Sequence, residues 1–194
     1  MELAAPGSQI SLSLTPDGTR LLFLDNFRDL SLFNLAQPDH LEPLLHDGSV
    51  NGLGQVSPDG KWVAYISDES GRFETFVRPF PAVSGRREKV SIDGGQYPLW
   101  GPKGDELFYM DLNGGMMAAS VKLSPTLSLG GVTKLFNWEK PPKGLSGRPY
   151  DISPVDGRFL MVKPAAQNQG APTEISVVVN WFEELRQRVP LAAR

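Results

Sequence analysis

Short apolar runs separated by polar turns recur along the whole chain. Four of these runs directly follow a turn phrase that contains proline and glycine, and they comprise Leu21–Leu24, Trp62–Ile66, Leu107–Met110 and Phe159–Val162. The turn phrases themselves are Thr15–Gly18, Ser57–Gly60, Gly101–Gly104 and Ser153–Gly157, and successive prolines within them are 42, 44 and 52 residues apart. A period of this size, with one turn and one strand signature per unit, is typical of a β-propeller.

The turn phrase has a physical basis in its residue types. Proline fixes φ near −65°, which suits the first central position of a type I turn, and aspartate is tolerated at the second. Glycine supplies the left-handed conformation from which the next strand starts. The third phrase has Lys103 where the others have aspartate, and the fourth has an additional Val155. Both changes still permit a turn, so the pattern predicts a hairpin in every unit.

The second unit shows the predicted strands most clearly. Gln55 and Val56 end an inner strand, and the following strands are predicted at Trp62–Ser67, Phe73–Arg78 and Glu88–Ile92. The run Trp62–Ser67 is apolar at almost every position, as expected of a strand sandwiched between two neighbouring sheets. Four short antiparallel strands in one period correspond to one propeller blade.

The other units repeat this plan. The predicted strands are Leu21–Leu24, Leu30–Leu35 and Glu42–Leu45 in the first unit, Leu107–Met110, Met116–Val121 and Thr133–Asn137 in the third, and Tyr150–Ile152, Phe159–Lys163 and Ile175–Asn180 in the last. The pattern therefore predicts an all-β fold of about four blades. We expect residues 1–194 to form a single propeller domain or a portion of one, with units at 1–45, 46–92, 93–138 and 139–180.

The last unit has no evident outer strand, which leaves two ways to complete the ring. Residues 1–5 resemble the outer strand of a preceding blade, so they would complete the last blade and close a four-bladed ring. This closure would also remove an exposed sheet edge. Alternatively, the chain is part of a larger ring of six to eight blades. An incomplete ring predicts self-association.

The end of the sequence changes character and predicts a short helix over residues 181–189. Asn180 is suited to the N-cap, with Glu183 three residues later. Phe182, Leu185 and Val189 share one face at helical spacing, and Pro190 ends the pattern. We interpret the helix as a cap over the last blade, with docking of a partner domain as the alternative.

Composition and charge narrow the function classes. The chain has 194 residues, 40% of them hydrophobic, and a net charge of −3, so no overall positive field favours nucleic acid. The absence of cysteine excludes disulfides and thiolate chemistry. No apolar run is long enough to span a membrane, and the first residues lack the pattern of a signal peptide. These features are compatible with either a periplasmic or a cytoplasmic location.

The repeat phrases resemble a known family. Ser57–Tyr65 and Trp100–Tyr109 are similar to the WD40-like PD40 repeats of bacterial TolB-type propellers, and the resemblance covers nearly the whole chain. The segments Gly94–Lys122 and Val177–Trp181 resemble more particularly the C-terminal propeller of proteins linked to bacterial serine/threonine kinases. This resemblance implies a protein- or ligand-binding module, and its kinase-linked members imply a sensory role. The motif is specific for fold rather than for function.

Few residues suggest catalysis. The histidines are His40 and His46, which we predict to be exposed loop residues, and there is no Gly-x-Ser-x-Gly elbow. Asp17, Asp59 and Asp156 recur because turns require them and are predicted to have no acid–base role. The sequence therefore predicts no cofactor, no metal site and no catalytic residues. An enzyme with its site at the central channel, such as a hydrolase or lyase, remains the alternative.

The most informative surface is predicted where loops enter the third and fourth inner strands. Tyr97, Trp100, Arg148 and Tyr150 flank these strands, and aromatic residues with arginine are typical of interaction hot spots. Packing between blades is the competing interpretation of the same residues. We predict a non-catalytic interaction module that binds a protein, a peptide or a small ligand on one face of the propeller.

Overall fold

The computed structural model describes residues 8–37, 41–124, 126–138 and 147–162, and in this part of the chain every regular element is a β-strand. Three antiparallel sheets have four strands each, and one has two strands. The strands of blade 1 are β1 (Gln9–Leu14), β2 (Arg20–Asp25), β3 (Asp29–Asn34) and β4 (Leu41–Leu45); those of blade 2 are β5 (Asn51–Val56), β6 (Trp62–Ser67), β7 (Glu74–Pro79) and β8 (Glu88–Lys89); those of blade 3 are β9 (Gln96–Trp100), β10 (Glu106–Met110), β11 (Gly115–Lys122) and β12 (Ser128–Asn137); and those of blade 4 are β13 (Tyr150–Ile152) and β14 (Phe159–Met161).

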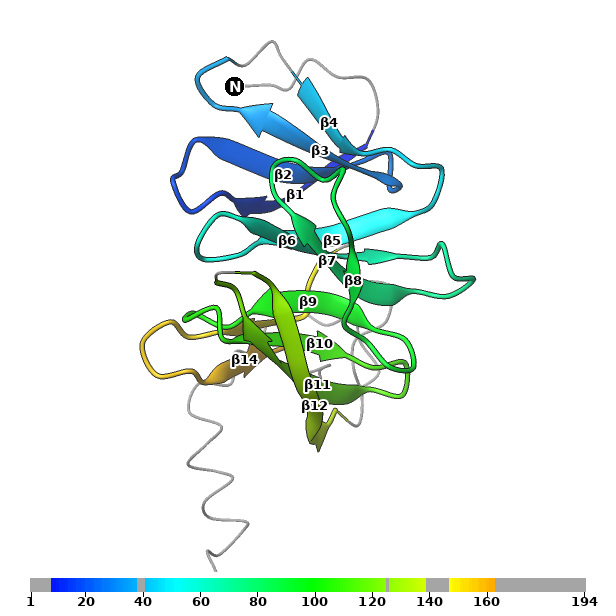
Figure 1. Cartoon of the computed structure of the whole chain (residues 1–194), viewed down its shortest axis with the longest axis vertical. Coiled ribbons are helices and arrows are strands. Elements are labelled where there is room, and N and C mark those ends of the chain that lie inside the picture. The colour runs from blue at the N-terminus through cyan, green and yellow to red at the C-terminus, as the bar shows by residue number, and fades with distance from the viewer. Residues whose placement is uncertain (1–7, 38–40, 125, 139–146, 163–194) are drawn as a thin grey trace, which may run out of the picture.

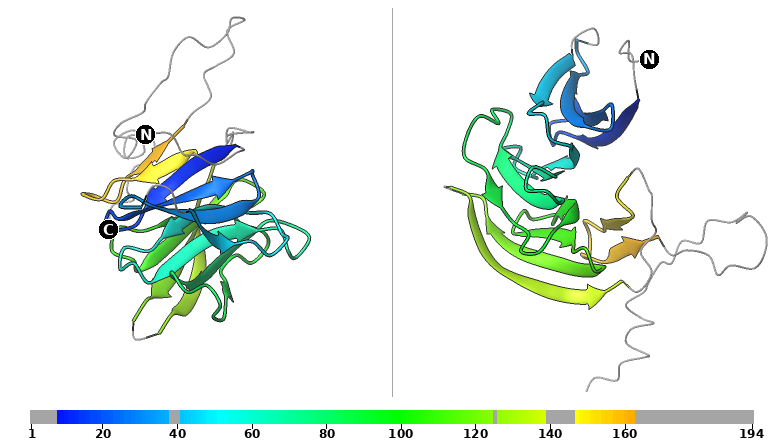
Figure 2. Two further views of the ribbon diagram at one scale, coloured as in Figure 1. Left: turned by 90° about the horizontal axis from the view of Figure 1, so that it is seen from above. Right: turned by 90° about the vertical axis from the view of Figure 1, so that its right-hand side faces the viewer.

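Each sheet is a simple meander in which every strand pairs with the next strand in sequence. The sheets follow one another along the molecule, from blade 1 at the top of Figure 1 to blades 3 and 4 at the bottom. Figure 2 shows that the blades curve around a common side, with the first strand of each blade on the inside. The first strands of blades 1, 2 and 3 also contact one another in succession. We call β1, β5, β9 and β13 the inner strands.

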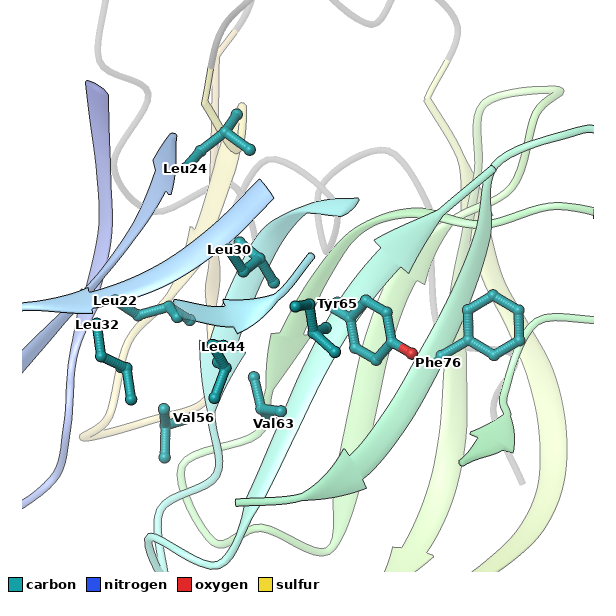
Figure 3. Close-up of a cluster of buried hydrophobic side chains, with 10 residues drawn as sticks. Leu22, Leu24, Leu30, Leu32, Leu44, Val56, Val63, Tyr65 and Phe76 are labelled. Atoms are coloured by element: carbon teal, nitrogen blue, oxygen red, sulfur yellow. The ribbon is translucent and has the colours of Figure 1, made fainter. Parts of the chain in front are cut away.

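The hydrophobic core is divided into three layers, one between each pair of neighbouring blades. Figure 3 shows the layer between blades 1 and 2, in which leucines of β2 and β3 face Val63, Tyr65 and Phe76. The second layer, between blades 2 and 3, includes Ala64, Val77, Trp100, Leu107 and Tyr109. The third layer, between blades 3 and 4, consists of Leu99, Phe108, Met116, Ala118, Tyr150 and Ile152.

Strand β6 shows why the central strands are apolar on both faces. Val63 and Tyr65 contact the first core layer, whereas Ala64, on the opposite face, belongs to the second. Side chains of a strand alternate between its two faces, so a strand between two layers requires apolar residues at successive positions. The prediction made for Trp62–Ser67 is therefore confirmed.

Close approach of neighbouring blades depends on Gly54 in β5. A Cβ atom at this position would lie 2.8 Å from Leu22 Cδ2 and 3.1 Å from Leu30 Cδ1. The absence of a side chain lets the inner strand of blade 2 lie directly against the core of blade 1.

The repeated turn phrases form the predicted hairpins. In the second phrase, Ser57 Oγ donates to Asp59 Oδ1 (2.6 Å), the Gly60 amide donates to the Ser57 carbonyl (2.9 Å), and Gly60 has a φ of +71°. In the first phrase, Thr15 and Asp17 form the same side-chain hydrogen bond at 2.5 Å. In the fourth, the Arg158 amide donates to Asp156 at 3.3 Å. The turn role predicted for the three aspartates is confirmed.

Two outer strands differ in length from the sequence prediction. The strand predicted at Glu88–Ile92 is paired only over Glu88–Lys89, because the amides of Val90 and Ser91 both point to the Thr75 carbonyl and interrupt the ladder. The strand predicted at Thr133–Asn137 begins earlier, at Ser128, where Leu129 pairs with Val121 despite the following glycines. The predicted strand at Ile175–Asn180, the predicted helix at 181–189 and the closing role of residues 1–5 lie outside the described residues.

Candidate binding site on the inner strands

Inner strands β5 and β9 share an irregularity at equivalent places in the repeat. In β5 the register shifts between Gly52 and Gln55, and in β9 it shifts between Gln96 and Leu99. Leu53 and Tyr97 lie in these bulges with φ values of +49° and +57°. A positive φ is unfavourable for residues with a side chain, and bulges near functional sites often redirect a side chain. The bulge of β9 is therefore a candidate functional position.

Two side chains at the start of blade 4 form hydrogen bonds to the bulge of β9. The Tyr150 hydroxyl donates to the Tyr97 carbonyl at 2.6 Å, and Arg148 Nε donates to the next carbonyl, that of Pro98, at 3.0 Å. Two consecutive carbonyl groups of one inner strand are thus bound by side chains at the start of the next inner strand. The pair of hydrogen bonds fixes blade 4 against blade 3 at the inside of the curve.

Burial has different consequences for the two side chains. Burial raises the pKa of the Tyr150 hydroxyl, so it is neutral and acts as a donor at physiological pH. Burial lowers the pKa of the Arg148 guanidinium, and nearby Tyr150 and Asp151 oppose this effect. Arginine nevertheless stays protonated in proteins. Arg148 is therefore a partly desolvated cation.

Trp100 faces the other neighbour of blade 3. Its backbone amide donates to Gln55 Oε1 at 2.7 Å, and its indole Nε1 donates to the Gln55 carbonyl at 3.1 Å. The side chain is 3% exposed and belongs to the core layer between blades 2 and 3. Its position favours the packing interpretation.

The four predicted binding residues are thus divided between two interfaces. Tyr97, Arg148 and Tyr150 lie together between blades 3 and 4, whereas Trp100 lies between blades 2 and 3. Tyr150 is buried, and only Tyr97 and Arg148 are partly exposed. Binding by these residues stays a prediction. Gln55 was not expected from the sequence, since nothing in a single polar residue indicates a partner 45 positions away.

A serine–histidine–aspartate arrangement occurs in blade 1. Ser31 Oγ lies 3.0 Å from His46 Nε2, and His46 Nδ1 lies 3.7 Å from Asp29 Oδ2. His46 is exposed and lies in the loop after β4, as predicted, and it also lies within hydrogen-bond distance of the buried Ser31. Strand pairing places Leu30 opposite Leu45, which brings the residue after β4 close to the start of β3, and this register is not evident in the sequence.

The geometry of this cluster does not match that of a hydrolase. Ser31 is only 4% exposed and lies in the middle of β3, which is paired along both edges. Acyl transfer requires a reachable nucleophile and free N–H groups to stabilise the oxyanion. The separation of 3.7 Å between His46 and Asp29 also exceeds a hydrogen bond. The arrangement is suited to anchoring the segment that follows β4. His40 lies outside the described residues.

Glu74 is the most buried carboxylate described, at 1% exposure. Its oxygens accept hydrogen bonds from Arg72 Nε (2.8 Å), the Gly94 amide (3.0 Å) and the Ser91 hydroxyl, and Lys89 Nζ lies 3.4 Å away. Burial would raise its pKa, but these donors outweigh burial and lower it. All its neighbours belong to blade 2 or to the connection toward blade 3, so this network has a structural role.

Across the described ranges, no group of three or more His, Cys, Asp or Glu side chains is arranged to hold a metal ion. The same part of the chain contains no helix of the length and hydropathy that a membrane crossing requires.

The antiparallel four-stranded sheets, their meander order and their succession around one side define propeller blades. Comparison with solved structures supports this class. TolB from Acinetobacter baumannii superposes with a TM-score of 0.60 and 18% identity, over 88% of this chain and 41% of that one. A TolB-type protein from Agrobacterium tumefaciens gives 0.54 and 17%, over 69% and 51%. The all-β fold is therefore that of TolB-like propeller blades.

A puromycin-hydrolyzing peptidase from Mycobacterium tuberculosis is similar in fold as well, with a TM-score of 0.59 and 18% identity over 82% of this chain and 29% of that one. The chain thus spans about half, or less, of the length of these three structures. No model of a known protein family matches the sequence, and no curated protein matches it significantly. Identities below one fifth show a shared fold and leave the function open.

Proposed function

We propose that this chain is a non-catalytic binding module that recognises a protein or peptide partner through the inner strands of blades 3 and 4. The observation that supports this most directly is Arg148, a partly buried cation beside the bulged Tyr97 at the inside of the curve. Arginine and tyrosine are enriched among residues that dominate binding energy. The repeat residues, in contrast, are occupied in turns and core layers.

The resemblance to kinase-linked propellers supports a sensory role for such a module within a longer protein. Binding at the inner strands would then change the position of an attached domain. The solved TolB proteins and the peptidase to which the chain is similar in fold are each about twice as long as the matched part, or longer.

A displayed library of random peptides tests the binding function. The chain is immobilised, and enriched clones are compared on wild type and on variants Tyr97→Ala and Arg148→Ala. We expect at least one variant to reduce binding of the enriched clones about tenfold or more, because hot-spot truncations commonly cost about 2 kcal/mol or more. Arg158→Ala is the matched control, since this exposed arginine of the same blade pairs with Asp156 in a turn.

Circular dichroism and thermal melting establish that each variant is folded. Failure to enrich any peptide, or equal binding of the enriched clones to wild type and both folded variants, would contradict the proposed function. Tyr97→Phe keeps the ring and therefore provides a milder second variant if Tyr97→Ala unfolds.

The enzyme alternative has one specific observation in its favour, the cluster of Ser31, His46 and Asp29. It predicts covalent labelling of Ser31 by a fluorophosphonate probe. We expect no labelling, because the hydroxyl is buried within a paired strand. Mass spectrometry of the treated protein provides the measurement, and stoichiometric modification of Ser31 that is lost in His46→Gln would favour a hydrolase instead.

A further inference from the structure

Among the described arginines, Arg148 combines partial burial with a single hydrogen bond and no ion pair, whereas Arg28, which also binds only a carbonyl group, is exposed. Arg20, Arg72, Arg86, Arg87 and Arg158 each have a carboxylate oxygen within 4.0 Å. Arg78, which is partly buried like Arg148, donates from Nε to the Tyr65 hydroxyl (2.8 Å) and from Nη1 to the Val83 carbonyl (2.9 Å). Within the described part of the chain, Arg148 has one hydrogen bond, from Nε to the Pro98 carbonyl, and no carboxylate there forms an ion pair with it.

We propose, on the basis of the binding function above, that the Nη1–Nη2 edge of Arg148 binds a carboxylate of the partner. Nε is already bound to the Pro98 carbonyl, which fixes the plane of the guanidinium. The two terminal nitrogens then present parallel N–H donors, an arrangement that matches the two oxygens of a carboxylate. A partly desolvated cation without a counter-ion is costly, and an anion bound at this edge removes that cost.

The surroundings favour a carboxylate over a phosphate group. Among the described residues, the acidic side chain that acts electrostatically on Arg148 is Asp151, whose negative charge would repel a dianion more strongly than a monoanion. Tyr97 contacts the core layer between blades 3 and 4 and remains partly exposed. Its ring can pack against an apolar group next to the carboxylate. A peptide that ends in an aromatic residue, or one with an acidic side chain, has this chemistry.

Side-chain NMR of the ¹⁵N-labelled chain tests the proposal. The probes are acetyl-Gly-Gly-Phe with a free C-terminal carboxylate, the same peptide as its amide, acetyl-Gly-Glu-Gly-amide and inorganic phosphate. We expect saturable shifts of the Arg148 Nε–Hε signal and the Tyr97 amide with one of the two carboxylate peptides, and none with the uncharged amide. Which carboxylate peptide binds distinguishes a chain terminus from an acidic side chain.

Two variants make the result specific to Arg148. Arg148→Gln should weaken binding of the carboxylate peptide at least tenfold, whereas Arg158→Gln should leave it unchanged. Arg148→Lys keeps the charge but not the paired donors, so it should bind with intermediate strength and serves if Arg148→Gln does not fold. Equal binding of the acid and amide peptides, tighter binding of phosphate, or unchanged binding by Arg148→Gln would overturn the carboxylate assignment.

Failure of the carboxylate assignment can be distinguished from failure of the proposed binding function. Library peptides that require Tyr97 but bind Arg148→Gln as strongly as wild type would refute the carboxylate assignment while leaving the binding module intact. Absence of any peptide binding at the inner strands would refute both.

Discussion

At the scale of single residues, the carboxylates of Asp17, Asp156 and Glu74 have structural roles that depend on their position in the blade. Asp17 and Asp156 accept hydrogen bonds from the hydroxyls of Thr15 and Ser153, which lower the pKa of each aspartate. Their recurrence in the sequence follows from turn geometry. Glu74 does not belong to the repeated turn phrase. Its buried carboxylate accepts hydrogen bonds from four donor groups, which stabilise its charged form.

Replacement of Glu74 by glutamine should destabilise the chain by about 1–3 kcal/mol at pH 7, because charge-assisted hydrogen bonds to a buried group are lost. The pKa of Glu74 is lower in the folded state than its ordinary value of 4.5. The stabilisation from its ionised form is therefore complete at neutral pH and is lost as the pH falls through the folded-state pKa. Urea unfolding of wild type and Glu74→Gln at pH 7 and at successively lower pH should show the difference shrinking.

Glu42→Gln is the control for this prediction, since Glu42 forms a partly exposed ion pair with Arg20 at 3.7 Å. Such pairs contribute at most about 1 kcal/mol. Equal effects of the two substitutions, or a Glu74→Gln difference that is independent of pH, would contradict the role assigned to the buried carboxylate.

At the scale of the strand, the outer edges of the three complete blades are unequal. Strand β4 contains Pro43 and β8 has two residues, so both offer a short or interrupted edge. Strand β12 has ten mostly exposed residues, and among the described strands it pairs only with β11. Long edges with unpaired backbone groups promote association with other chains, and charged residues such as lysine oppose it. Lys134 is an exposed residue of this strand, and its Nζ lies 3.9 Å from Asp111 Oδ2.

Lys134→Val should increase self-association, because it replaces the charge on the open edge by a β-branched apolar residue. We expect sedimentation velocity to show a several-fold larger dimer or higher-oligomer fraction than wild type at the same concentration. Lys122→Val is the matched control, since Lys122 ends β11, which lies between β10 and β12. Similar sedimentation of Lys134→Val and Lys122→Val would show that the β12 edge is not the site of association.

At the scale of the whole molecule, the sequence predicts the succession of blades well because one local phrase specifies one hairpin in each unit. Turn residues and alternating apolar positions are local signals, and they place β2, β6, β10 and β14 correctly to within a few residues. The length of an outer strand depends on its neighbour: β12 extends through Gly130 and Gly131 because β11 is long enough to pair with it.

The candidate site could be predicted only in part for a related physical reason. Periodicity brings Tyr97 and Tyr150 to inner strands of neighbouring blades, and the structure joins them at 2.6 Å. The positive φ of Tyr97 results from the bulge, which has no local sequence signal beyond its equivalence to Leu53. The contact between Ser31 and His46 depends on strand register. The hydrogen bond from the Trp100 amide to the Gln55 side chain depends on how blades 2 and 3 pack together.

Ring closure within the chain stays a prediction of the sequence. If residues 1–5 complete the last blade, their deletion should lower the melting temperature or cause aggregation, because a sheet edge becomes exposed. Thermal unfolding and light scattering of the truncated and intact chains provide the comparison. Unchanged melting together with monomeric behaviour would refute this form of closure and favour assembly as part of a larger ring.

The most direct test of binding at the inner strands is amide hydrogen exchange of the chain with and without a peptide selected from the library. The turns and core layers form the scaffold, and the proposed binding surface lies on the inner strands of blades 3 and 4. We therefore expect slower amide exchange on peptide binding in β9 (Gln96–Trp100) and β13 (Tyr150–Ile152). Protection confined to the outer strands β4, β8 or β12, with exchange of the two inner strands unchanged, would contradict it.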